Sequence, residues 1–142
     1  GVMGMYTELV LNVGLSDTVP KDVIVILRYM LSREGEKPTG GHDLFSTDRW
    51  EWMLRSGSFY FVPEAQSKLI ENFPEQESPT YHLSIRCDLK NYSNEIESFL
   101  SWIAPYVEDF GDPVFGGYTR YEEAENPTLI YFSNGEVEYR VV

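Results

Sequence analysis

Residues 81–90 alternate between apolar and polar side chains, and the polar ones could bind a ligand together. There His82, Arg86 and Asp88 alternate with apolar residues, so they are expected to share one face of a β-strand. A histidine, carboxylates, arginines and a tyrosine on one surface make a binding site for a small polar ligand. The candidate ligand-binding residues are Tyr6, Glu8, His82, Arg86, Asp88 and Arg120.

The same alternation has a second interpretation, in which these residues form only a solvated sheet face. Cross-strand ion pairs are common on any antiparallel sheet that buries one side, and they need no ligand. The sequence leaves both interpretations open.

Metal binding and nucleophilic catalysis find little support. His42 and His82 are the two histidines, and no pair of potential ligands has the spacing of a zinc or calcium motif. Cys87 falls on the apolar side of its strand, where a thiol is inert. The adjacent His42 and Asp43 are expected to serve a loop or a helix cap. We expect no metal, no cofactor and no catalytic residue.

The stretch DRWEWMLRSGSFYF, residues 48–61, is the richest in aromatic residues. A short helix through residues 48–56 would place Trp50, Met53 and Leu54 on one side, as core. Trp52 would lie on the other side, and tryptophan dominates the energetic centres of protein interfaces. Trp52 is therefore the candidate interface anchor.

The charge narrows the choice of partner. The net charge is −12, and residues 64–125 hold 13 acidic and 4 basic residues. Nucleic acids and anionic membranes are disfavoured, because both are bound through lysine and arginine. A basic protein is an acceptable partner, with Glu122, Glu123 and Glu125 as candidate rim charges, although such acidity also serves solubility alone.

Periodicity predicts the regular elements. Strands are expected over residues 5–15, 58–62 and 81–90, a helix over residues 20–32, and mostly loop over residues 63–80.

The remainder of the chain is predicted to be a helix followed by a meander. Asn94 and Glu97 have the spacing of a capping box, and Pro105 predicts a kink or an end near Ala104. Gly116-Gly117 predicts a bulge in the next strand, and Asn134-Gly135 predicts a hairpin turn.

The element order therefore reads strand, helix, strand, strand, helix, strand and hairpin. This order resembles the ferredoxin-like split β-α-β-β-α-β fold, which implies an antiparallel sheet with two helices on one face, extended by a C-terminal hairpin. The alternative is an α+β sandwich whose last three strands form a separate sheet. Residues 1–142 are expected to form a single domain, with residues 1–4 a tag remnant or disordered.

Two functions remain in competition. The first is a non-catalytic binding or regulatory module that acts through protein contacts, either as an acidic partner of a basic protein or by self-association. The second is a small-polar-ligand-binding or enzymatic domain that uses the open sheet face. The single cysteine favours a reducing compartment, so a cytoplasmic location is expected.

Overall fold

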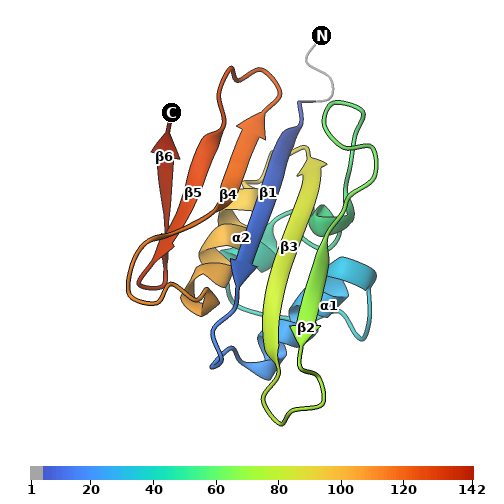
Figure 1. The fold of residues 1–142 in the computed structure, drawn as a ribbon. Helices are drawn as coiled ribbons and strands as arrows, with labels where there is room; N and C mark the ends of the chain where they lie inside the picture. The colour runs from blue at the N-terminus through green and yellow to red at the C-terminus, as the bar shows by residue number, and fades with distance from the viewer. Residues whose placement is uncertain (1–4) are drawn as a thin grey trace.

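An open antiparallel sheet dominates the computed structural model, which describes residues 5–142. The expectation for residues 1–4 lies outside these described residues. The strands are β1 (Thr7–Gly14), β2 (Lys68–Asn72), β3 (Thr80–Leu89), β4 (Val114–Tyr121), β5 (Thr128–Ser133) and β6 (Glu136–Val141). They form one sheet in the order β2-β3-β1-β4-β5-β6, and every neighbouring pair is antiparallel (Figure 1). The protein is thus an α+β fold, and the alternative of a separate C-terminal sheet is wrong.

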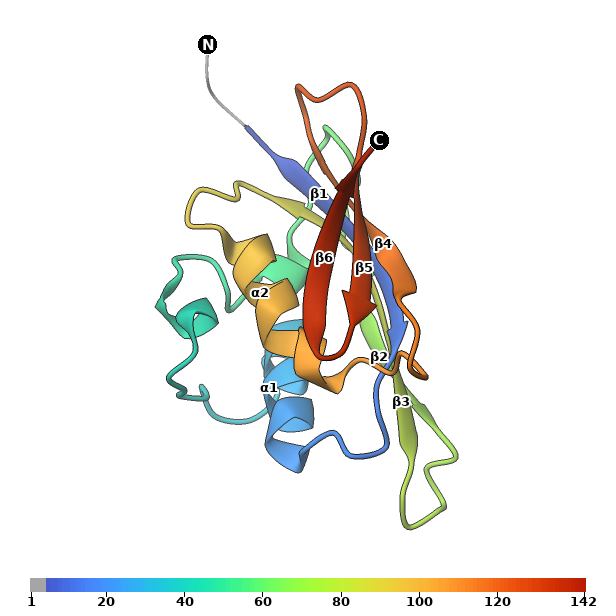
Figure 2. The same cartoon turned by 90° about the vertical axis from the view of Figure 1, so that its left-hand side faces the viewer.

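Both α-helices cover the same face of this sheet (Figure 2). The helices are α1 (Lys21–Ser32) and α2 (Glu95–Ile103). Short 3-10 turns η1 (Asp43–Ser46), η2 (Met53–Arg55) and η3 (Ala104–Tyr106) complete the helical layer. None of the helices in residues 5–142 covers the other face of the sheet, and we refer to that face as the open face.

The core lies between the sheet and the helices. On β3 the inward residues Leu83, Ile85 and Cys87 are at most 1% exposed, as the alternation predicts. Burial raises the pKa of the Cys87 thiol far above its ordinary range, so this thiol is a packing residue. Trp50, Met53 and Leu54 are also buried, which confirms their expected place in the core.

The segment before β2 differs from the prediction. Residues 58–62 do not form a strand; instead the Ser58 N–H donates to the Val62 carbonyl and closes a tight turn. The second strand is β2, in a segment predicted to be mostly loop. Its edge position leaves it half exposed, so its residues lack a clear apolar alternation.

Residues 57–65 form a compact loop whose two ends are fixed to β3. The Asp88 N–H donates to the Ser56 carbonyl at 3.0 Å, and Gln66 exchanges two backbone hydrogen bonds with Arg86. A loop with its ends held this close together is an Ω-loop. We call it the 57–65 loop; it rises beside the upper part of β3 in Figure 1.

The start of α2 uses a different cap from the predicted one. Asn94 has a left-handed φ of 58° and its side chain makes no cap hydrogen bond, so the proposed capping box is wrong. Asn91 does this work: its Oδ1 accepts from the Ile96 N–H at 2.8 Å and its Nδ2 donates to Glu97. The end of the helix is confirmed, because α2 stops at Ile103 before Pro105.

The C-terminal signals are confirmed. The β4–β5 register shifts between Phe115 and Gly117, and Gly117 has φ 150° with the Val10 carbonyl so close that a Cβ would collide with it. Asn134 and Gly135 both have positive φ, as a two-residue hairpin turn between β5 and β6 requires.

Candidate functional site

Side chains on the open face form rows across the strands. Glu8 pairs with Asp88 on one side and with Arg120 on the other. The next row contains Arg86, and the row after it contains Ser84 between Lys68 and Asn12. Of the candidate ligand-binding residues, Glu8, Asp88 and Arg120 therefore share one row, while Arg86 lies in the next row.

The row of Glu8 and Asp88 is closed to solvent. Glu8 is 3% exposed and Asp88 is 0% exposed, so the expectation that both face solvent is wrong. The 57–65 loop provides the cover: the Val62 N–H donates to Asp88 Oδ2 at 3.2 Å, and the Tyr60 ring packs on Tyr6. Arg120 lies 3.8 Å from the Glu8 carboxylate and also stacks on Phe61.

Asp88 is only partly satisfied in this arrangement. Its Oδ1 is buried and has no hydrogen-bond partner among the described residues. A buried polar atom without a partner costs about 1–3 kcal/mol. The pair lies in a closed structural layer, so it is not available to a ligand from solvent.

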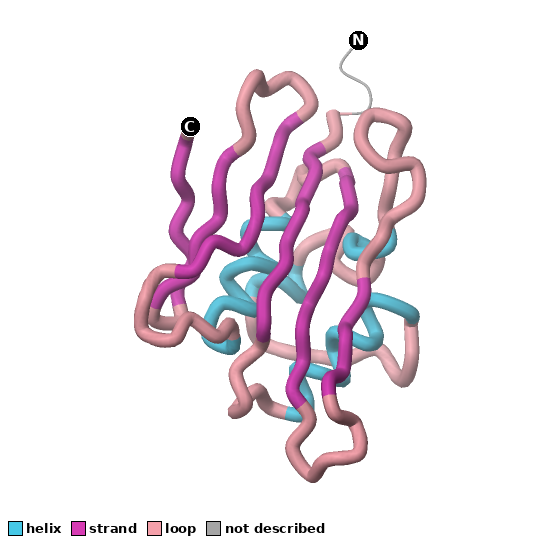
Figure 3. Tube along the Cα trace, in the orientation of Figure 1, coloured by secondary structure: helices cyan, strands magenta, loops and turns pink. Residues whose placement is uncertain are grey.

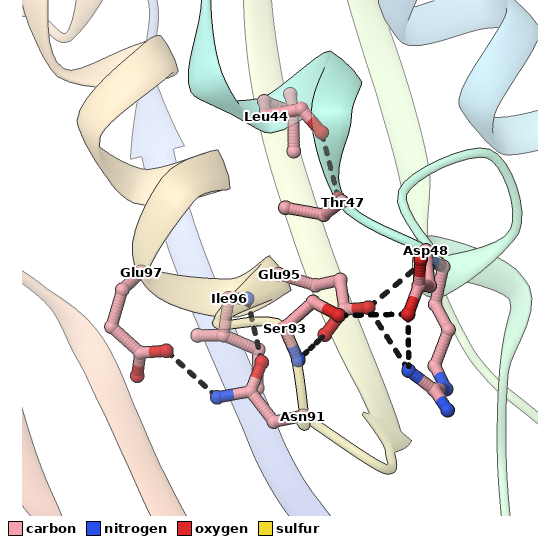
Figure 4. Close-up of polar contacts among 9 residues, drawn as sticks. Leu44, Thr47, Asp48, Asn91, Ser93, Glu95, Ile96 and Glu97 are labelled. Carbon is pink, nitrogen blue, oxygen red and sulfur yellow. Dashed lines mark hydrogen bonds and ion pairs between the residues drawn. The ribbon is translucent and has the colours of Figure 1, made fainter.

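A third buried carboxylate, Glu95, differs from Asp88 because its oxygens accept several hydrogen bonds (Figure 4). Glu95 accepts from the Ser93 N–H at 3.1 Å and from both the backbone and the guanidinium of Arg49, at 3.0 and 3.3 Å. These bonds tie residues 48–49 to the start of α2. Glu95 is therefore a structural residue with its hydrogen-bonding capacity in use.

An open hollow occupies the middle of the open face, beside the edge strand. It has a volume of about 500 Å³ and we call it the basic hollow. Its polar lining includes Arg86 and Lys68 but no aspartate or glutamate; the lining residues are Val10, Asn12, Ala65, Gln66, Ser67, Lys68, Ser84, Ile85 and Arg86.

A separate hollow of about 550 Å³ lies where β1 ends, and we call it the acidic hollow. Its charged lining residues are Asp17 and Glu108, with no lysine or arginine among them. His82 lines this hollow and not the basic one, so His82 and Arg86 do not converge on one site. Asn12 lines both hollows.

Three connections lie at this end of the sheet, and together we call them the acidic end. Two of them, residues 15–20 and 107–113, contribute to the lining of the acidic hollow, and the third joins the ends of β2 and β3 that line it. Leu15 forms a bridge with Val107, the Glu108 N–H donates to Gly14, and the Leu15 N–H donates to Tyr81. The connections are residues 15–20, 73–79 and 107–113. They lie at the lower end of the sheet in Figure 3, where the turn between β2 and β3 projects away from the other loops. They carry acids and no lysine or arginine: Asp17, Glu75, Glu77, Glu108, Asp109 and Asp112.

Two phenylalanines in these connections are exposed. Phe110, which lines the acidic hollow, is 87% exposed, and Phe73 is 59% exposed. Both have left-handed backbones, with φ of 52° and 55°, which is uncommon for residues other than glycine. Sequence reasoning missed this end of the molecule, because its residues are brought together only by the topology.

The predicted interface residues lie elsewhere. Trp52 is 46% exposed, beside the buried Met53. Glu122, Glu123 and Glu125 follow β4, next to the start of β1 and therefore at the end opposite the acidic hollow. Glu122 is partly buried and its carboxylate accepts from the Tyr6 N–H, so it fixes the start of β1, while Glu123 and Glu125 are exposed.

Within residues 5–142, no cluster of three or more histidine, cysteine, aspartate or glutamate side chains is suited to a metal ion. No helix in the described part of the chain has the length and apolar character needed to cross a bilayer. Comparisons with protein-family models, with curated proteins and with solved structures find no match to the chain.

Proposed function

We propose that this protein is a non-catalytic binding module that docks a basic segment of another protein at its acidic end. The observation that carries this proposal is the acidic hollow. Two carboxylates, Asp17 and Glu108, line it together with the exposed ring of Phe110 and with His82, and the lining contains no lysine or arginine. A lysine or arginine side chain has the complementary chemistry.

The chemistry of such a contact is straightforward. A guanidinium can make charge-assisted hydrogen bonds to a carboxylate and can stack on an aromatic ring. The surrounding carboxylates of the acidic end would attract a basic partner and speed its association. Two acidic ends would repel each other, so a different basic protein is favoured over self-association.

The exposed phenylalanines support a role in contact. Neither Phe73 nor Phe110 buries its ring, and each holds a left-handed backbone that costs about 1–2 kcal/mol. Because both rings are exposed, they contribute little to the stability of the fold. Phenylalanine is enriched at the centres of protein interfaces, and Phe110 lines the hollow itself.

The experiment measures binding of a synthetic peptide of alternating glycine and arginine by calorimetry at low salt. The test variant is Asp17→Asn with Glu108→Gln, and the matched control is Glu123→Gln with Glu125→Gln. Both remove two charges from exposed or partly exposed positions. We expect the test variant to weaken binding by about tenfold and the control by less than about twofold.

A general attraction to the acidic surface would weaken both double variants equally, and that result would overturn the proposed site. A larger effect of the control would instead locate the partner near Glu123 and Glu125, at the other end of the sheet. Trp52→Ala should leave peptide binding unchanged, since Trp52 does not line the acidic hollow.

We also propose that the first four strands and the two α-helices form a ferredoxin-like split β-α-β-β-α-β unit. The strand order supports this: β1 and β2 are joined by α1 and separated by β3, and β3 and β4 are joined by α2 and separated by β1. The β5–β6 hairpin would be an extension. A cytoplasmic location is also proposed, supported only by the single free thiol of Cys87.

A further inference from the structure

The basic side chains of residues 5–142 fall into two groups, with and without a partner. Most of the 11 lysines and arginines make an ion pair, donate a hydrogen bond or stack on an aromatic ring. Within residues 5–142, those that show none of these contacts are Lys21, Arg33, Lys68 and Arg86. Two of them, Lys68 and Arg86, line the same hollow.

The sheet holds these two cations next to each other. Lys68 lies directly opposite Ser84 on β3, and Arg86 is two residues further along the same strand. Such diagonal neighbours are about 7–8 Å apart at the backbone, within reach of two long side chains. Two unpaired like charges at this distance repel each other, in a chain where acidic residues outnumber basic ones 23 to 11.

The remaining lining supplies further donors. Asn12 on β1 contributes an amide, and Ser84, directly opposite it on β3, contributes a hydroxyl. Two positions along β1 and β3 from the lining residues Val10 and Arg86 are the carboxylates of Glu8 and Asp88, and the 57–65 loop with Arg120 closes them off. The hollow thus offers two cations and neutral donors, with no competing acid in its lining.

We propose that the basic hollow is a binding site for an oxyanion, the phosphate or carboxylate group of a small ligand. Arg86 would bind it with two parallel N–H donors and Lys68 with one, while Ser84 and Asn12 would orient it. Its volume of about 500 Å³ lies within the usual range of small-ligand sites, about 300–1,000 Å³. Hydrogen bonds between strands fix all the contributing backbones in advance.

This site is separate from the docking of a basic segment. The two hollows have opposite charge, although Asn12 lines both. Evidence against docking at the acidic end would therefore not count against oxyanion binding in the basic hollow, and the reverse also holds.

The experiment titrates the ¹⁵N-labelled protein with inorganic phosphate, and in parallel with acetate, following the Arg86 side-chain Nε–H signal and the backbone amides. Ionic strength is held constant with sodium chloride. Saturable shifts centred on Lys68, Ser84 and Arg86, with a Kd of about 1 mM, are expected for phosphate. Saturation by acetate as well would identify a general carboxylate and phosphate site.

The test variant is Lys68→Ala with Arg86→Ala, and the matched control is Lys21→Ala with Arg33→Ala, which removes the other two unpartnered cations. We expect the test variant to lose at least about tenfold in affinity and the control to change by less than about twofold. Arg86→Lys keeps the charge but not the paired donors, so it should weaken phosphate binding severalfold.

Equal losses in the two double variants would show attraction by net charge alone and would overturn the proposal. Linear, non-saturating shifts in the wild-type protein would overturn it as well. The test variant should still bind the glycine-arginine peptide as the wild type does, which separates this site from the acidic end.

Discussion

Glu8 lies directly opposite Asp88 in the pairing of β1 with β3, and both carboxylates are buried beside the 57–65 loop. Only Glu8 has a basic partner, Arg120 at 3.8 Å, and Asp88 Oδ1 has none among residues 5–142. The hydrogen bond from the Val62 N–H to Asp88 Oδ2 is therefore the main polar interaction that stabilises the buried Asp88 side chain.

Replacement of Asp88 tests this relationship. Asp88→Asn keeps an oxygen that accepts from Val62, so the free energy of unfolding should fall by less than about 1 kcal/mol. Asp88→Ala removes the acceptor and leaves the Val62 N–H unpaired, which should cost about 1–3 kcal/mol more. Urea denaturation measures both, with Asp112→Asn as an exposed control. Equal losses for Asn and Ala would show that the Val62 hydrogen bond contributes nothing.

The phase of β3 gives a second prediction. Leu83 and Ile85 are fully buried, while Ser84 lies between them on the open face. Leu83→Ala or Ile85→Ala should each cost about 2–4 kcal/mol, and Ser84→Ala should stay within about 0.5 kcal/mol. Chemical denaturation checks the ranking, and a reversed order would contradict the assigned faces.

The cap of α2 gives a third prediction. Asn91→Ala removes the acceptor for the Ile96 N–H and should cost about 1–2 kcal/mol. Asn94→Gly should be neutral or stabilising, because Asn94 has φ 58° and its side chain caps nothing. Thermal unfolding of the two variants distinguishes them. A greater loss at Asn94 would restore the capping box that the sequence favours.

Acid sensitivity at the acidic end gives a fourth prediction. Hydrogen bonds from the Gly111 and Asn134 N–H groups hold the pKa of Asp109 below its ordinary value of 3.8. The unfolded chain therefore binds this proton at higher pH than the folded protein does. The stability that Asp109 supplies is present above pH 3.8 and is lost as the pH falls through the folded pKa.

Asp109→Asn removes that titration. Between about pH 5 and about pH 2.5 the wild type should lose more stability than this variant, as urea midpoints would show. Parallel losses would mean that Asp109 does not tie the β5–β6 turn to the α2–β4 connection.

The structural features that could be predicted from the sequence are those that depend on a local residue pattern. The alternation of residues 81–90 identified the inward face of β3, and Asn134-Gly135 identified the final turn, because each signal requires only neighbouring residues. The strand β2 was missed, since an edge strand that is half exposed needs no apolar alternation.

The candidate sites were predicted less well because they depend on packing between distant segments. The 57–65 loop buries Glu8 and Asp88. Residues 58–62 of this loop were predicted to be a strand because aromatic residues favour strands. Asp17 and Glu108 are far apart in the chain and meet only because residues 107–108 pair with residues 14–15.

The most direct test of docking at the acidic end is to map the glycine-arginine peptide onto the ¹⁵N-labelled protein by chemical-shift perturbation. The account predicts saturable shifts concentrated in residues 15–20, 80–82 and 107–114, which line the acidic hollow or adjoin its lining residues. Shifts centred instead on the Trp52 indole N–H, or on residues 121–125, would contradict it.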